Sequence, residues 1–256
     1  MGYPQGLLKT RAVIRAGEYA VIPPQGRVNN VIPTIQGCDM SILASPKLGA
    51  SFVQYIGTAH PGGGSIAPFA DEEGIESFIF VLDPDGVLDI TIDEEQHTLN
   101  AGGYAYASPD SSLFFTNNIN SSVRFLLYKQ RYIPFGEERP CSLVGNINDI
   151  DEQEYDNMAN VFVRDLLPTD VRFDMNMHTL SFEPSGSHPF VETHVQEHGA
   201  YIYEGEGLYL LGEQWIQVEK EDFLFFGPFI QQAVYATGRG RLTYIYSKDC
   251  NRDVAL

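Results

Sequence analysis

The feature that most restricts the fold of this chain is an internal repeat with a period of about 120 residues. Gly64 and Gly186 are 122 residues apart. Glu76 also lies 122 residues before His198, and an apolar segment follows each of these two residues. Further along, the segments YAYASPD and DFLFFGP match at an offset of 118. Repetition at this spacing indicates two copies of one structural unit. The sequence therefore predicts a duplicated fold.

Each copy is composed of short strands. The segments are rich in β-branched and aromatic residues, Gly, Pro, Asp and Asn separate them, and turn signals recur about every 8 to 12 residues, as in sandwiches and barrels. Long helical periodicity is nearly absent. We therefore predict an all-β protein with two units of about 130 residues each. The clearest predicted strands are Phe78–Leu82, Leu88–Ile92, Val123–Tyr128, Leu208–Leu211 and Leu242–Tyr246.

Charge and composition exclude several classes of partner. The chain carries 34 acidic and 16 basic residues, a net charge of −18, so nucleic acid is not an expected partner. No run of 18 apolar residues occurs, and the N-terminal segment MGYPQGLLKTR resembles no signal peptide, so no membrane association is expected. The three cysteines are far apart and form no CxxC pair, which favours a reducing compartment and a cytoplasmic location.

One segment carries the residue types of a metal site. Residues 186 to 205 read GSHPFVETHVQEHGAYIYEG, with Glu192, His194 and His198 within seven positions. Glu192 and His194 are two residues apart, so on an extended strand both point to one face, and His198 can return to that face after a turn. A single histidine beside glycine is usually a turn or core residue, but this spacing predicts a cradle of ligands. The other four histidines are interpreted as ordinary turn or core residues, with His178 and His188 as pocket residues at most.

The spacing resembles the first motif of the cupins, Gly, five residues, His, one residue, His, three or four residues, Glu, six residues, Gly. Here the ligand types are exchanged, with Glu192 at the first His, His194 at the second and His198 at the Glu position. The second cupin motif ends on a fourth ligand, and its last position here is Gln232. That motif is weaker, because Glu221, Gly227 and Phe229 replace its Gly, Pro and Gly.

The cupin resemblance implies two tandem barrels of the double-stranded β-helix, or jelly-roll, type, a bicupin. The polar and acidic stretch 146–160 is typical of a connector with one short helix, so we expect an N-terminal barrel over 1–145 and a C-terminal barrel over 161–256. In the first barrel the positions matching the ligands are expected to be Ala70, Glu72, Glu76 and Phe114. That barrel is therefore expected to be degenerate and metal-free, and the second to hold the active site.

The donor set indicates the metal. Two imidazoles, one carboxylate and one amide oxygen suit Mn(II) or Fe(II), and we favour Mn(II). One carboxylate against a divalent ion leaves a net positive site, which attracts an anionic substrate such as a carboxylate.

The whole chain resembles the (S)-ureidoglycine aminohydrolase family of allantoin degradation, above all in ETHVQEHGAYIYEGEGLYLL and YIYSKDCNRD. The resemblance implies Mn(II) bound by Glu192, His194, His198 and Gln232, and release of ammonia from (S)-2-ureidoglycine to give (S)-ureidoglycolate. It also implies that Tyr244 and Lys248 complete the substrate pocket together with Glu192 and Gln232. Glu192 and Lys248 are the expected catalytic residues, Glu192 as a proton carrier and Lys248 as the partner of the substrate carboxylate.

Two other functions fit the same residues. Two histidines and a carboxylate also form the iron site of Fe(II) cupin dioxygenases, and a bicupin can bind a small acid without catalysis. Direct displacement of ammonia and elimination to an imine followed by hydration both remain open. Because exposed sheet edges tend to pair, we also expect a homo-oligomer.

Overall fold

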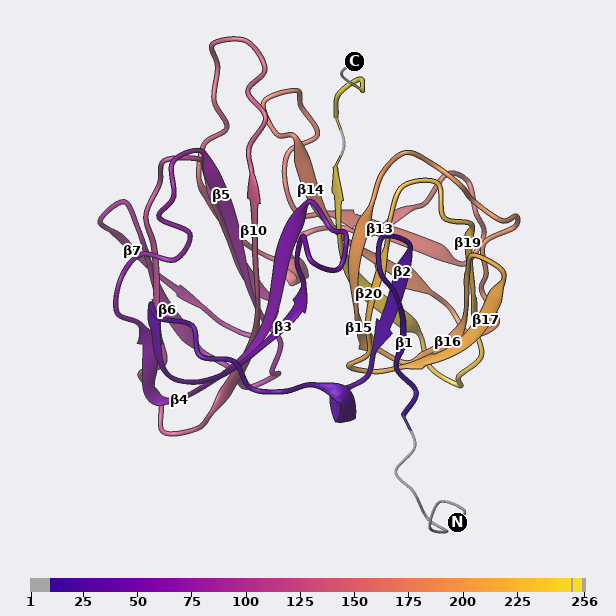
Figure 1. Ribbon diagram of the computed structural model, residues 1–256, viewed down its shortest axis with the longest axis horizontal. Coiled ribbons are helices and arrows are strands. Elements are labelled where there is room, and N and C mark those ends of the chain that lie inside the picture. Colours follow the sequence, from indigo (N-terminus) through magenta and orange to yellow (C-terminus); the bar gives the residue numbers. More distant parts are fainter. Residues whose placement is uncertain (1–9, 250, 255–256) are drawn as a thin grey trace.

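The computed structural model describes residues 10–249 and 251–254 (Figure 1). The prediction of an all-β chain is confirmed, since its regular structure consists of strands and two short 3-10 turns. None of the described helices is long and apolar enough to cross a membrane. The N-terminal segment read for targeting signals lies mostly outside the described residues. In chain order the elements are β1 Val13–Arg15, β2 Tyr19–Ile22, η1 Pro24–Gly26, β3 Ile35–Ala44, β4 Phe52–Ser65, β5 Ile75–Val81, β6 Leu88–Ile92, β7 Glu95–Leu99, β8 Gly103–Ala107, β9 Leu113–Thr116, β10 Val123–Arg131, β11 Leu143–Asn146, η2 Ile147–Asp149, β12 Gln153–Glu154, β13 Val161–Asp165, β14 Met175–Phe182, β15 His198–Glu204, β16 Glu206–Leu211, β17 Gln214–Glu219, β18 Phe223–Phe226, β19 Gln232–Ala236 and β20 Leu242–Asp249.

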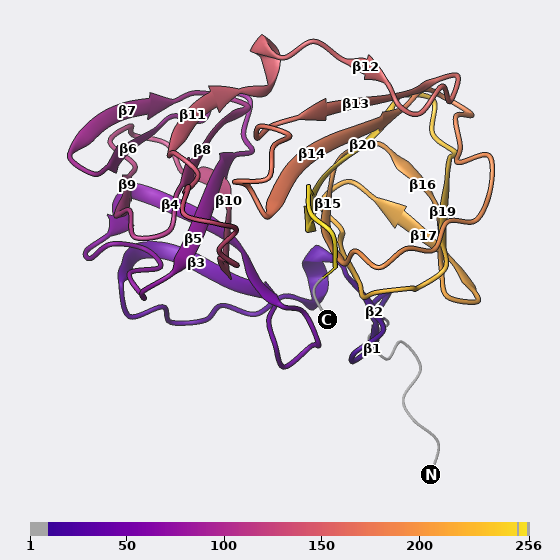
Figure 2. The same cartoon turned by 90° about the horizontal axis from the view of Figure 1, so that it is seen from above.

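The strands form two barrels that lie side by side, as the bicupin prediction requires (Figures 1 and 2). The first is one antiparallel sheet in the order β11-β8-β5-β10-β4-β9-β6-β7, with β3 paired to β4. The second combines the sheet β1-β2-β18-β15-β20-β14-β13-β12 with the smaller sheet β17-β16-β19. Two isolated bridges, Ser187 to Tyr235 and Glu192 to Gln232, tie the segment after β14 to β19 and so close the second barrel. Each barrel has its own apolar interior.

An aromatic layer joins the two barrels. The ring of Phe52 on β4 stacks on Tyr128 on β10, with centroids 4.9 Å apart, and meets the edge of Phe225 on β18 at 6.2 Å. Tyr106 on β8 lies 5.4 Å from Phe173, just before β14. These side chains belong to a buried cluster to which both barrels contribute. Burial of each such ring is worth about 1.5 to 3 kcal/mol, so the barrels pack as one body.

The N-terminal strands do not belong to the first barrel's sheet. β2 pairs with β18 and β1 pairs with β2, so both extend the larger sheet of the second barrel (Figure 2). Just before β1, the Arg11 guanidinium donates two hydrogen bonds, of 2.7 and 2.8 Å, to the buried carboxylate of Asp222. The expected assignment of all residues before 146 to the first barrel is therefore wrong for Val13–Ile22. Sequence patterning finds strands but does not say which sheet an N-terminal strand joins.

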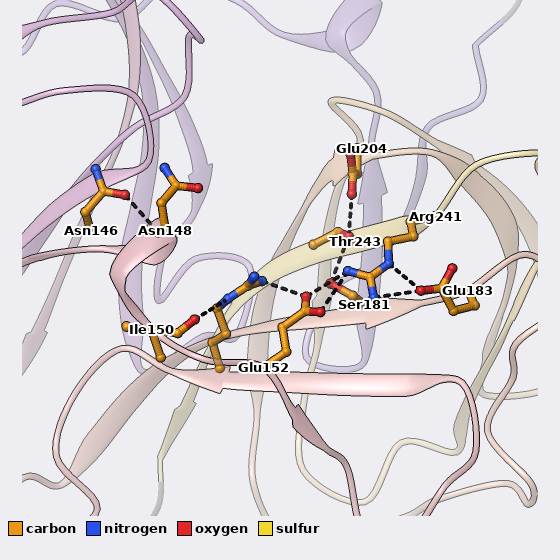
Figure 3. Close-up of polar contacts among 10 residues, drawn as sticks. Asn146, Asn148, Ile150, Glu152, Ser181, Glu183, Glu204, Arg241 and Thr243 are labelled. Atoms are coloured by element: carbon orange, nitrogen blue, oxygen red, sulfur yellow. Dashed lines mark hydrogen bonds and ion pairs between the residues drawn. The ribbon is translucent and has the colours of Figure 1, made fainter.

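The connector is held against the second barrel. Glu152 accepts a hydrogen bond of 2.7 Å from Arg164 on β13 and bonds of 2.8 and 3.0 Å from Arg241, just before β20 (Figure 3). Arg241 also donates to Glu183 at 2.8 Å. Further along, the connector side chains Tyr155 and Met158 pack onto the interior of the second barrel. The connector is thus part of the wall of that barrel.

The strand register corrects the predicted alignment of the two copies. The bridge between Phe69 and Leu113 in the first barrel corresponds to the bridge between Glu192 and Gln232 in the second. The pairing of Ser77 with Ala107 in the first barrel corresponds to the pairing of His198 with Phe226 in the second. Ala107 and Phe226 each belong to the apolar interior of their own barrel. The equivalents of these three ligands are therefore Phe69, Ser77 and Leu113. The expected Ala70, Glu76 and Phe114 are each wrong by one residue, a slip that reverses the face on which a strand residue lies.

The two carboxylates predicted at the first barrel's ligand positions lie outside its interior. Glu72 is exposed and pairs with Lys129 at 2.8 Å. Glu76 faces the layer between the barrels, fully buried, where the Tyr106 hydroxyl and the Gln130 amide donate to its carboxylate. Burial, followed by the negative charge of nearby Asp174, raises the pKa of Glu76 well above its ordinary value. Folding therefore favours the protonated form of Glu76 over the charged form.

This environment predicts a pH-dependent effect of Glu76→Gln on stability. Folding raises the pKa of this acid. Between the pKa of the unfolded chain and the pKa of the folded chain, only the unfolded chain releases the proton, so the free energy of unfolding falls as the pH rises. An amide cannot ionise, so we expect Glu76→Gln to raise the free energy of unfolding at pH 8 by about 1 to 3 kcal/mol, the usual cost of a poorly compensated buried polar group. The gain should shrink towards pH 4.5. Thermal or urea unfolding at several pH values measures it.

Glu72→Gln is the matched control. Its ion pair with Lys129 is largely exposed, so the change should alter stability by less than about 1 kcal/mol and should bring no gain at high pH. Equal responses of the two variants to pH would contradict the raised pKa of Glu76.

Candidate metal and substrate site

One cavity in the second barrel brings together all six residues singled out in the sequence. Glu192 and His194 lie in the segment between β14 and β15, and His198 is the first residue of β15. The remaining three lie on strands, Gln232 at the start of β19, and Tyr244 and Lys248 on β20. All six line the same cavity, which has a volume of about 20 Å³. That is room for one water molecule or ion.

The two imidazoles are oriented by backbone carbonyl groups. Nδ1 of His194 lies 3.1 Å from the carbonyl oxygen of Gln196, and Nδ1 of His198 lies 2.8 Å from that of Ser247. A carbonyl oxygen only accepts hydrogen bonds, so each Nδ1 carries the proton and each neutral ring presents a lone pair at Nε2. Burial lowers the pKa of His194 and lowers that of His198 well below its ordinary value. Both rings are therefore neutral near pH 7.

The two lone pairs point towards each other. The Nε2 atoms of His194 and His198 are 3.3 Å apart. Without a proton between them, two acceptors at this distance repel, whereas a cation between them is attracted by both. Two ligands each about 2.1 Å from one ion and at right angles would be about 3 Å apart. The spacing of these nitrogens therefore fits a bound metal ion.

Gln232 approaches the same point from the start of β19. Its side-chain amide nitrogen lies 2.6 Å from Nε2 of His194, and its Oε1 is 3.4 Å from the Tyr209 hydroxyl. Rotating the amide by half a turn brings its oxygen beside the imidazoles and its NH2 group beside Tyr209. The backbone of Gln232 is fixed by two hydrogen bonds with Glu192, of 2.8 and 2.9 Å. The segment carrying Glu192 is thus locked to the strand carrying Gln232.

Glu192 and Lys248 supply the charges of the cavity. Burial raises the pKa of Glu192, and the positive charge of Lys248 opposes that rise. Lys248 also lowers the pKa values of His194 and His198, after the larger effect of burial on each ring. Within residues 10–249 and 251–254, no three His, Cys, Asp or Glu side chains converge as a preformed metal cluster. The donors that meet directly are two imidazoles and one amide, with the Glu192 carboxylate on the same cavity wall.

Several lining residues were not predicted from the sequence. Tyr246 lies two residues after Tyr244 and two before Lys248, so the alternation of a strand could have identified it. Tyr155 comes from the acidic connector, where nothing marks it as a pocket residue. His188, which was predicted from the sequence to be a pocket residue at most, also lines the cavity. It is buried, its Nδ1 has no hydrogen-bond partner among the described residues, and burial and the neighbouring His194 lower its pKa to about 4. The other additional lining residues are Leu180 and Phe226.

Comparison of the sequence with known proteins identifies close relatives. No family model matches the chain. The (S)-ureidoglycine aminohydrolase of Escherichia coli strain K12 is 44% identical over 256 residues, which cover 100% of this chain and 97% of that protein. The probable (S)-ureidoglycine aminohydrolase of Oryza sativa subsp. japonica is 32% identical over 249 residues, 95% of this chain and 76% of that protein.

Two solved structures share the fold of this chain. The crystal structure of the protein Ylba from E. coli matches with a TM-score of 0.87 and 42% identity, and the match covers 100% of both chains. A formate complex of oxalate decarboxylase from Lactobacillus farciminis matches with a TM-score of 0.69 over 91% of this chain and 86% of that chain. At 11% identity, this second match shows a shared fold only. By its full-length identity to curated relatives, the chain belongs to the (S)-ureidoglycine aminohydrolase family.

Proposed function

We propose that this protein is a metal-dependent hydrolase that releases ammonia from (S)-2-ureidoglycine and forms (S)-ureidoglycolate in purine catabolism. The substrate class comes from the full-length relatives. The observation that carries the metal dependence is the pair of imidazole lone pairs held 3.3 Å apart by hydrogen bonds from each Nδ1 to a backbone carbonyl. We assign Mn(II) to this site, with Glu192, His194, His198 and Gln232 as its ligands.

The donor set supports a hard or borderline ion. Imidazole nitrogen, carboxylate oxygen and amide oxygen favour Mn(II) or Fe(II) over metals that prefer thiolate ligands. When bound, such an ion acts as a Lewis acid and orients the substrate groups around the α-carbon. Hydrolysis needs only water as a second reactant, whereas the alternative of an Fe(II) dioxygenase needs oxygen. Ammonia release from (S)-2-ureidoglycine under anaerobic conditions supports the hydrolase. Turnover that needs oxygen would support the dioxygenase, and no turnover with or without oxygen would leave a binding protein.

The protein's own side chains have distinct roles in this proposal. Lys248, an ammonium group on the cavity wall, binds the substrate carboxylate. Burial raises the pKa of Tyr244 well above its ordinary value, so its hydroxyl stays protonated and donates to a substrate oxygen. Glu192 lines the same cavity and carries a proton between water and the departing amine. Throughout the reaction the two neutral histidines donate their Nδ1 protons in hydrogen bonds to backbone carbonyl groups.

We also propose a homo-oligomeric, cytoplasmic protein. The outer face of the sheet β17-β16-β19 exposes Leu208, Trp215 and Tyr235, and the rings of the last two are 5.3 Å apart. Exposed aromatic side chains of this kind are common in contacts between subunits. The location rests on the cysteine spacing, which favours a reducing compartment.

The metal assignment predicts about one Mn(II) per chain. The first barrel lacks donors at two of the four ligand positions, because Phe69 and Leu113 stand there. Elemental analysis of protein equilibrated with Mn(II) and then desalted measures the ratio. His194→Ala combined with His198→Ala should abolish retention. Two tightly held ions per chain, or one retained by the double variant, would disprove this assignment.

The role of Lys248 predicts a kinetic defect without loss of metal. Lys248→Met should retain Mn(II) at the wild-type ratio but lower kcat/KM for ammonia release at least tenfold. A charged partner removed from a desolvated site costs about 2 to 5 kcal/mol, whereas an exposed ion pair is worth less than about 1 kcal/mol. A rise in KM alone would indicate that Lys248 binds the ground state and the transition state equally. A fall in kcat would indicate that Lys248 also orients the α-carbon of the substrate.

Lys220→Met is the matched control, because Lys220 is exposed and lies outside the cavity. It should leave both constants unchanged. Unaltered kinetics in Lys248→Met would assign carboxylate binding to other groups of the cavity.

A further inference from the structure

We propose that the first barrel, which offers no ligand, positions the metal ligand His198 through Ser51 and Phe52, and that these two are positioning residues for the site. This inference rests on the proposed metal site. The strand β15 begins at His198 and borders the layer between the barrels. Both neighbours of His198 in the chain, Glu197 and Gly199, contact the first barrel directly. The ligand is therefore held on both sides by the other half of the molecule.

Before the ligand, Glu197 is fixed by Ser51 of the first barrel. The backbone N–H of Ser51 donates to both carboxylate oxygens of Glu197, at 3.0 and 3.2 Å, and its hydroxyl donates to one of them. The backbone N–H of Glu197 donates at 3.0 Å to Asp249, the residue that follows Lys248. Glu197, which is buried, thus links the first barrel through its side chain to the end of β20 through its backbone N–H. The two ends that it joins carry His198 and Lys248.

After the ligand, Gly199 lets the first barrel approach the backbone of β15. A Cβ atom at Gly199 would lie 2.8 Å from ring carbons Cε2 and Cζ of Phe52, and closer still to the side-chain oxygen of Gln54. The ring of Phe52 cannot retreat freely, because Tyr128 stacks on its face and Phe225 packs on it from the second barrel. The absence of a side chain at Gly199 therefore sets the distance between the barrels at this point.

These contacts bear directly on the geometry of the ligand. The backbone N–H of Gly199 donates at 3.1 Å to the Ser247 hydroxyl, and the carbonyl of Ser247 accepts from Nδ1 of His198 at 2.8 Å. A shift of β15 relative to β20 changes both hydrogen bonds and hence the direction of Nε2. Carbon atoms normally pack 3.5 to 4.0 Å apart, so a contact of 2.8 Å forces a movement of about 0.7 Å or more. Metal–ligand distances tolerate only about 0.2 Å.

The test compares Gly199→Ala with Gly240→Ala. Both add one methyl group, but at Gly240 the new atom meets nothing within 4 Å, so this control should bind Mn(II) as the wild type does. Loss of groups that orient metal ligands commonly costs 10- to 100-fold in affinity. We expect Gly199→Ala to weaken Mn(II) binding by about that factor in a chelator competition. Gly199→Ala combined with Phe52→Leu, which removes the two ring carbons but leaves the Gln54 side chain, should recover part of the loss.

Ser51 gives an independent variant if Gly199→Ala fails to fold. Ser51→Ala removes one donor to Glu197 and should weaken Mn(II) binding several-fold, whereas Ser51→Thr keeps the hydroxyl and should not. A readout without metal separates this inference from the proposed function. In the metal-free wild type, nitrogen NMR should show His198 protonated at Nδ1 with slow proton exchange. Exchange should become faster in Gly199→Ala and Ser51→Ala at unchanged melting temperature.

The outcomes are distinct. If the wild type binds no Mn(II) while the NMR differences appear, the proposed metal is wrong and the positioning by the first barrel stands. If Gly199→Ala and Ser51→Ala both match the Gly240→Ala control in metal affinity and in exchange, the first barrel does not position the ligand and this inference is overturned.

Discussion

The site depends on one electrostatic constraint, that two imidazole lone pairs facing each other at 3.3 Å inside a barrel repel each other and favour a cation between them. The arrangement persists because each Nδ1 proton is committed to a backbone carbonyl, which leaves neither ring free to turn its donor towards the other. Burial keeps both rings neutral, so protonation does not relieve the repulsion near neutral pH. The strands around the site are arranged so that a positive ion is the complement of the cavity.

The same strands explain why one barrel holds donors and the other does not. At corresponding bridges the second barrel has Glu192 and Gln232, and the first has Phe69 and Leu113, both buried in an apolar interior. The duplicated fold thus provides two equivalent positions, and local side-chain chemistry makes one polar and the other a packed core. The first barrel keeps its polar carboxylate, Glu76, on the outer face of β5, where it contributes to contact between the barrels.

Much of the architecture could be read from the sequence, because its signals are local. Strand composition, turn spacing and the motif around Glu192, His194 and His198 depend on residues close together in the chain, and the structure brings these side chains to one cavity. The exact alignment of the repeat could not be read, since a slip of one residue changes little in the apolar pattern but reverses the face of every side chain. Tyr155 and the crossing of β2 to the second barrel depend on contacts between distant segments, which no local pattern encodes.

That crossing has a consequence for how the chain is made. The strand Tyr19–Ile22 leaves the ribosome about 200 residues before its partner Phe223–Phe226 exists. At typical rates of synthesis, 5 to 20 residues per second, the delay is roughly 10 to 40 seconds. During this delay the three residues of β2 that are buried in the folded protein have no sheet to join. The first barrel must complete its own strand pairing without pairing with β2. The second barrel can therefore close only after Phe223–Phe226 has been synthesised, so a strand made about 200 residues earlier is among the last to join its sheet.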